Sequence, residues 1–154
     1  MRIVKYTTLY ENNLPVLVKE KATNYEIQKL TSPSDVALML SSVFALNRQT
    51  EEIVYMVALS AKGNVLGVFE VSRGTATWSA INPREIFLKA LLCGAVNIIL
   101  AHNHPSGDTT PSTEDLTATK RVKEAGKILG LPLLDHVIVG DGYYSLKENN
   151  LMED

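Results

Sequence analysis

The sequence has few of the residues on which several functional classes depend. Cys93 is its single cysteine, which excludes an internal disulfide and any zinc site built from cysteines. One cysteine also fits a reducing compartment, so we expect a cytoplasmic location. The formal net charge is −2, which provides no overall positive field for sequence-independent binding to nucleic-acid backbones.

Long apolar runs are also missing. No stretch reaches the roughly 18 apolar residues of a membrane-spanning helix, and the N-terminal segment 1–7 lacks the apolar run of a signal peptide. We therefore expect no membrane partner. The chain does have 154 residues, 45% of them apolar and 21% charged. That size and composition are typical of one globular domain with a packed core.

Predicted strands and helices alternate along most of the chain. Turn and capping signals predict helices over 33–46, 83–93 and 113–129, and strands over 53–60, 65–72, 96–102, 136–139 and 143–146. The strands at 53–60 and 65–72 are expected to pair as an antiparallel hairpin. Such alternation favours an α/β or α+β fold with helices packed on a sheet.

The first 30 residues differ from the rest. Two short β-like runs, 3–9 and 15–19, flank the turn-forming residues Glu11, Asn12 and Asn13. We therefore expect residues 1–30 to form an N-terminal β-like arm or hairpin, and residues 31–154 to form the main domain.

The chemistry is concentrated after the apolar strand predicted at 96–102. His102 and His104, two of only three histidines, lie where this strand enters a turn rich in proline and glycine. Side chains two residues apart on a strand point to the same face, so both imidazoles can converge on one point. Catalytic zinc sites commonly combine three histidine or carboxylate ligands with an open position.

Asp115 is the candidate for the third ligand, because a loop of ten residues can return the chain from His104 to the strand end. Its surroundings also read as a helix start, with Ser112 as N-cap and Asp115 at the third helical position. Similar starts occur at 32–35 and 82–85. Only the start at Ser112 follows two histidines, so both roles stay open for Asp115.

These residues together resemble the JAB/MPN metalloprotease superfamily, whose motif is often called JAMM. The motif elements are His102-x-His104, Ser112-x-x-Asp115 and a glutamate well upstream. Longer strings resemble the RadC-like branch of that superfamily over roughly residues 31–154: Asn82–Phe87, Ala101–Gly107, Pro111–Ser112 and Leu134–Gly140.

The resemblance implies a fold, a cofactor and a reaction. The fold would be a JAB/MPN-like central mixed sheet flanked by helices, with a layout like that of cytidine deaminases. His102, His104 and Asp115 would bind one Zn²⁺ per chain, and Ser112 would steady the oxyanion. Glu52 would act as general acid and base on the attacking water in the hydrolysis of an amide or isopeptide bond. The substrate would be a protein or peptide of unknown identity.

Some assignments stay open. The upstream glutamate aligns with Glu52, since counting back from Leu59 selects it over Glu51, but the strand is apolar on both faces and offers no independent check. His136 could assist the site, although a structural histidine at the start of a strand is the simpler interpretation. Trp78 could line a substrate groove or pack over the sheet. The oligomeric state is not indicated.

Other functions fit the sequence less well. A zinc deaminase needs Pro-Cys-x-x-Cys, which a single cysteine excludes, and an HNH-type nuclease leaves Ser112 and Asp115 unexplained. Longer RadC-like members carry a helix-hairpin-helix region associated with DNA, and residues 1–30 are too few and too β-like to form one. A role in DNA repair is thus possible only through family association. The remaining alternative is a metal-free JAB-like scaffold.

Overall fold

The computed structural model describes residues 1–75 and 80–153. Seven strands in these residues form one mixed sheet in the order β2-β1-β4-β3-β5-β6-β7. Their bounds are β1 Arg2–Glu11, β2 Leu14–Asn24, β3 Ile53–Leu59, β4 Val65–Arg73, β5 Asn97–Asn103, β6 Leu133–Val139 and β7 Tyr143–Ser145. The observed architecture is the expected mixed sheet flanked by helices. Trp78 lies outside the described residues.

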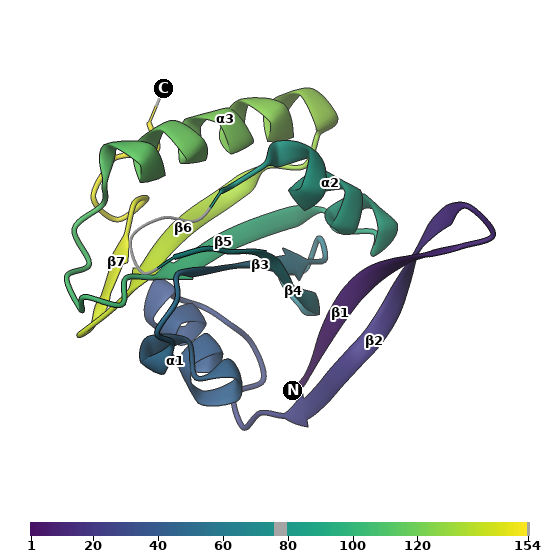
Figure 1. The fold of residues 1–154 in the computed structure, drawn as a ribbon, viewed down its shortest axis with the longest axis horizontal. Helices are drawn as coiled ribbons and strands as arrows, with labels where there is room; N and C mark the ends of the chain where they lie inside the picture. The colour runs from purple at the N-terminus through teal and green to yellow at the C-terminus, as the bar shows by residue number, and fades with distance from the viewer. Residues whose placement is uncertain (76–79, 154) are drawn as a thin grey trace.

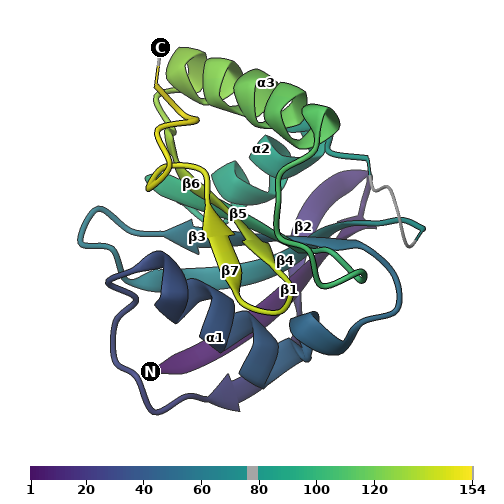
Figure 2. The same ribbon diagram turned by 90° about the vertical axis from the view of Figure 1, so that its left-hand side faces the viewer.

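The helices cover both faces of the sheet. Helix α1 (Pro33–Phe44) lies on one face, followed by a short 3₁₀ turn at Leu46–Arg48, whereas α2 (Pro83–Leu92) and α3 (Thr113–Leu129) lie on the other (Figures 1 and 2). Each face has its own apolar cluster, one packed around α1 and one beneath α2 and α3. The central strand β3 is buried along its whole length because it contributes to both clusters.

The N-terminal segment is a long hairpin that belongs to the sheet. β1 and β2 pair antiparallel through a turn in which Asn12 and Asn13 have positive φ, a conformation that asparagine tolerates better than most residues. β1 also bridges β4 in parallel through Lys5 and Val68. The far end of the hairpin extends beyond the helical layers (Figure 1).

Helix starts follow the sequence signals closely. Ser32 and Ser112 both form capping boxes, in which the serine hydroxyl accepts from the backbone N–H at N3 and the N3 aspartate accepts from the serine backbone N–H. Asn82 caps α2 through its side-chain oxygen. Helix α3 ends at Gly130, which adopts the left-handed conformation that glycine favours.

One strand boundary differs from the prediction and changes the setting of His136. Strand β6 begins at Leu133 rather than at His136, so this histidine lies in the middle of the strand. The prediction that it starts a strand was wrong, because Leu133 and Asp135 already pair with β5. The Asp135 carboxylate is satisfied within the fold, accepting from the backbone N–H of His136 and the hydroxyl of Ser145.

None of the helices in the described segments is long and apolar enough to cross a membrane. Helix α3 has one buried and one exposed face. Val122 and Gly126 are buried, whereas Ile128 is exposed.

Gly126 provides a test of how closely α3 packs against the chain that leaves it. A Cβ atom at Gly126 would lie 2.6 Å from the Leu131 carbonyl oxygen. We expect Gly126→Ala to lower the free energy of unfolding by about 1–3 kcal/mol, as overpacking does. Gly142→Ala is the matched control, because nothing lies within 4 Å of the position that its methyl group would take. Urea denaturation measures the free energy of unfolding of both variants. Equal losses in the two would contradict the close packing of α3 at Gly126.

Candidate metal centre

The end of β5 places two histidines on the face of the sheet that α3 covers. β5 lies between β3 and β6, with His102 paired to Val54 on one side and to Ile138 on the other. Because both neighbours continue past this point, His102 is fully buried, while His104 is partly exposed where the strand gives way to the loop. Strand alternation then directs both imidazoles to the same side.

Asp115 meets these two imidazoles from the first turn of α3. Its Oδ1 lies 3.2 Å from His102 Nε2, and its Oδ2 lies 3.3 Å from His104 Nε2. The two Nε2 atoms are 3.0 Å apart. Three potential ligand atoms therefore converge from a strand end and a helix start. Together the three residues form a group that could hold a metal ion.

Asp115 combines the predicted capping role with a position that faces the two histidines. Its Oδ2 accepts from the Ser112 backbone N–H at 2.8 Å, and Ser112 Oγ accepts from the Asp115 backbone N–H at 3.1 Å. This capping box fixes the carboxylate rotamer, and both oxygens still reach the histidines. Ser112 itself is exposed, and because its Oγ acts as acceptor in the cap, its hydroxyl proton stays available.

The electrostatics of the cluster favour a bound cation. Burial alone would raise the pKa of Asp115, but hydrogen bonds from His102 and His104 hold that pKa well below its usual range. The hydrogen bond to Asp115 raises the pKa of His104 against the opposing effect of burial, and the negative charge of Glu52 adds to the rise. The carboxylate is thus ionised and faces inward, which is the state that ligates metals.

Both imidazoles also have a partner at Nδ1, the ring nitrogen remote from Asp115. His104 Nδ1 lies 2.7 Å from the Asp108 carbonyl oxygen, within the loop that follows β5. His102 Nδ1 lies 2.8 Å from His136 Nε2, and His136 Nδ1 lies 2.6 Å from Thr119 Oγ1. Burial lowers the pKa of His136 well below its ordinary value. Ligand histidines in metal sites commonly have such partners on the nitrogen remote from the metal.

The structure separates Glu52 from Glu51. Glu52 is only 7% exposed and precedes β3, and its charge is close enough to influence His104. The side chain of Glu51 is 49% exposed, with a carboxylate oxygen 3.8 Å from Arg73 at the surface. Since Val54 pairs with His102, strand alternation places Glu52 on the histidine side and Glu51 on the opposite side. The apolar sequence of the strand does not by itself show on which side of the sheet each glutamate lies.

Sequence reasoning missed two residues that support the cluster, Asn103 and Thr119. Asn103, between the two histidines, accepts from the backbone N–H of Ile53 at 2.8 Å and donates to the Glu51 carbonyl at 3.0 Å. It therefore ties the end of β5 to the segment that carries Glu52. Thr119 was also missed, although its position four residues after Asp115 puts it on the same helical face.

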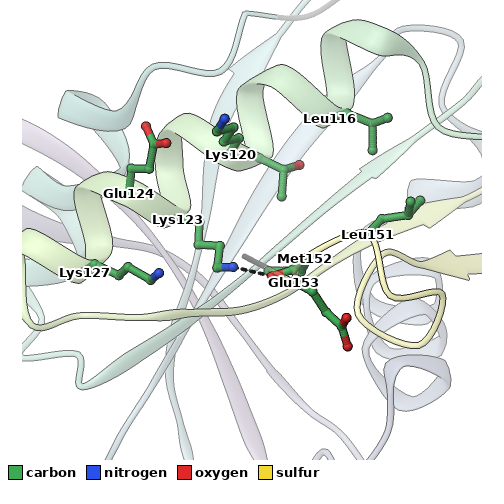
Figure 3. A pocket seen from close by; sticks show the side chains of 9 residues that line it. Leu116, Lys120, Lys123, Glu124, Lys127, Leu151, Met152 and Glu153 are labelled. Atoms are coloured by element: carbon green, nitrogen blue, oxygen red, sulfur yellow. Dashed lines mark hydrogen bonds between the residues drawn. The ribbon is translucent and has the colours of Figure 1, made fainter.

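A separate hollow lies along α3. It has a volume of about 320 Å³ and lies between the helix and the C-terminal segment, with Lys120, Lys123 and Lys127 along its rim (Figure 3). Thr119 contributes to its lining, but His102, His104 and Asp115 do not. The hollow is therefore distinct from the histidine cluster.

Comparison with known proteins agrees with this geometry. A family model described as "RadC-like JAB domain" matches residues 30–151. The chain belongs to this family. It is 44% identical to a UPF0758 protein of Clostridium beijerinckii over 133 residues, which are 86% of this chain and 57% of the relative.

Other relatives show the same pattern. A UPF0758 protein of Clostridium acetobutylicum is 44% identical over 84% of this chain and 56% of its own length. One from Alkaliphilus oremlandii is 42% identical over 86% of this chain and 55% of its own length. The RadC-like chain thus spans a little over half the length of these curated relatives.

Asn103 provides a test of the tie between β5 and the Glu52 segment. Asn103→Ala leaves the buried N–H of Ile53 without its acceptor, which should lower the free energy of unfolding by about 1–3 kcal/mol. Asn149→Ala is the control, because this exposed amide donates only to the Ser145 carbonyl near the end of the chain. Denaturant titrations measure the free energy of unfolding of the two variants. If both lost the same amount, the hydrogen bonds of Asn103 would contribute no more stability than the surface contact of Asn149.

Proposed function

We propose that this RadC-like JAB domain is a zinc-dependent hydrolase of amide or isopeptide bonds, with one Zn²⁺ per chain. The observation that carries the proposal is the convergence of His102, His104 and Asp115, whose ligand atoms lie within 4.8 Å of one another. The residues come from elements that the sheet and helix α3 hold in place. The family match supports the same assignment, because the JAMM motif pairs these residue types at this spacing.

The donor set fits zinc. Two imidazole nitrogens and one carboxylate oxygen are ligands that Zn²⁺ accepts readily, and three protein ligands leave a fourth position for water or substrate. The Nδ1 atoms of both histidines already have partners, so their Nε2 atoms are the ones directed to the shared point. When bound, zinc would lower the pKa of a coordinated water and polarise the substrate carbonyl.

Glu52 is proposed as the general base and acid. Its burial beside His104 and its place at the head of β3 suit a carboxylate that takes a proton from the attacking water and returns it to the leaving amine. Ser112 is proposed to donate its hydroxyl proton to the oxyanion, since its oxygen serves the helix cap while its proton is free for that bond.

The proposed substrate is a protein or peptide, since the chemistry assigned to the site is amide hydrolysis. A cytoplasmic setting suits the single cysteine, Cys93. A formal charge of −2 offers no general attraction to duplex DNA, so a nucleic-acid role rests on family association alone. The competing proposal is a scaffold without metal, which the complete and converging donor set disfavours.

Metal binding can be tested first by removing one ligand. His104→Ala takes away one of three donors and should reduce zinc stoichiometry from about one per chain to well below that, because two donors hold Zn²⁺ poorly. Elemental analysis after dialysis gives the measurement, and circular dichroism checks that the variant is folded. Parent protein that carries no zinc, or a variant with full occupancy, would contradict the assignment.

Glu52 can be separated from a ligand and from a surface residue by Glu52→Gln. This change keeps the shape but removes the basic carboxylate. We expect unchanged zinc content and a fall in peptide or isopeptide hydrolysis on the order of 10²-fold or more, as for loss of a general base. Glu51→Gln is the matched control, since the neighbouring carboxylate faces Arg73 at the surface.

Each combination of the two measurements has its own meaning. Loss of zinc in Glu52→Gln would identify Glu52 as a ligand rather than a base. Full activity in Glu52→Gln together with inactive Glu51→Gln would show that the register argument selected the wrong glutamate. Zinc binding without hydrolysis in the parent would favour a structural metal site.

A further inference from the structure

His136 is a buried histidine for which the proposed reaction has no use. Its side chain is fully buried in the middle of β6, on the face of the sheet beneath α3. One ring nitrogen lies 2.8 Å from His102 Nδ1, and the other lies 2.6 Å from Thr119 Oγ1. Neither partner carries a negative charge that would compensate a buried imidazolium, so the neutral ring is the favourable state.

A neutral imidazole has one donor and one acceptor nitrogen, and the direction of this hydrogen-bond chain is set at Thr119. The Thr119 hydroxyl has a single proton. Its oxygen lies 2.6 Å from the Asp115 carbonyl oxygen, which can only accept. The proton must point there, because two oxygen lone pairs at that distance would repel. Thr119 Oγ1 is then left as the acceptor for His136 Nδ1–H.

The direction of the hydrogen bond between Thr119 and His136 also sets the direction of the bond between His136 and His102. With its proton on Nδ1, His136 presents a lone pair at Nε2, and this lone pair accepts from His102 Nδ1–H. In its neutral form His102 is then unprotonated at Nε2, the atom directed at Asp115 and His104. The opposite direction would put a proton on His102 Nε2 and block it as a ligand.

We infer that Thr119 and His136 are positioning residues that fix His102 in the tautomer able to bind metal. This inference rests on the proposed metal-binding role of His102 and extends it to two residues outside the ligand set. The hydrogen-bond chain begins at the backbone carbonyl of Asp115 and ends at His102 Nε2, which faces the carboxylate of the same residue. His104 obtains the same tautomer separately, by donating from Nδ1 to the Asp108 carbonyl.

Thr119→Val tests the direction of the chain. Valine has a similar shape but neither accepts nor donates, so a proton on His136 Nδ1 would lose its acceptor. The ring should move its proton to Nε2 and donate to His102 Nδ1, which leaves His102 protonated at the ligand nitrogen. We expect zinc affinity to fall about 10–100-fold, as for other losses of support behind a ligand.

Two further variants separate tautomer control from general effects. Thr117→Val is the matched control: Thr117 lies on the same helix and donates to the carbonyl four residues earlier, as Thr119 does, but it is exposed. Thr119→Ser restores a hydroxyl at the decisive position. Zinc affinity close to that of the parent is expected for both. Thermal unfolding of all three variants shows whether any loss of affinity is only loss of folding.

The tautomers themselves can be measured by two-bond ¹H–¹⁵N correlation spectra of the histidine rings. With only three histidines in the chain, each ring can be assigned, and the spectra can be recorded with and without added zinc. The expected parent spectrum has His102 and His136 each protonated at Nδ1 and unprotonated at Nε2 in the zinc-loaded protein. In metal-free protein, the His136 pattern should be the same.

The outcomes distinguish this inference from the proposed function. A parent His136 protonated at Nε2, or at both nitrogens, overturns the inference even if zinc binds. A Thr119→Val variant that keeps the parent tautomer and parent affinity overturns it as well, as does a Thr119→Ser variant as weak as the valine variant. If the parent binds no zinc, the proposed function fails, and the metal-free spectrum of His136 still decides the direction of the chain.

Discussion

The arrangement of the candidate centre depends on the carboxylate of Asp115. It accepts from the backbone of Ser112, which fixes the start of α3, and it faces the Nε2 atoms of His102 and His104, which fix the end of β5. One side chain therefore joins the helix layer to the middle of the sheet. The Asp115 carboxylate can accept the capping hydrogen bond and still face both imidazoles, because its two oxygens have enough lone pairs for both sets of contacts.

The surroundings of the two histidines hold each ring by its Nδ1 atom, on the side away from the shared point. His104 is held by a loop carbonyl, whereas His102 is held by a chain through β6 and α3. The fully buried histidine thus depends on tertiary packing, and the partly exposed one depends on its own loop. The two histidines differ because β5 ends at Asn103, so that His102 lies inside the sheet and His104 lies in the loop that follows it.

Membership of the RadC-like JAB family and the geometry of the cluster support each other. The family match covers residues 30–151 and so includes each element that contributes to the centre, from α1 to β7. The β1–β2 hairpin lies almost entirely before the match and extends the same sheet from its far edge. The same aligned stretch is 86% of this chain and 57% of one relative, so the relatives are longer than this chain, and the activity and partners of the full-length proteins belong to a larger context than this fold.

Local signals in the sequence determined most of the elements. Ser112 and Gly130 defined both ends of α3, because capping and left-handed glycine are short-range effects, and the spacing of His102 and His104 predicted a shared face. The family resemblance then indicated the fold and the ligand set. The start of β6 was misplaced because the contacts that hold Asp135 within the sheet, among them that with Ser145 of β7, are made by residues outside the predicted strand.

Only the tertiary structure decided what depends on pairing between distant strands. Placing Glu52, rather than Glu51, on the histidine side of the sheet required the register of β3 against β5, since an apolar strand with both faces buried carries no alternation. The contacts of His136 with His102 and Thr119 required β6 to lie beside β5 and α3 to pack over this face of the sheet. Contacts between residues 17 and 34 positions apart leave no periodic trace in a single sequence, because they arise from the packing of whole elements.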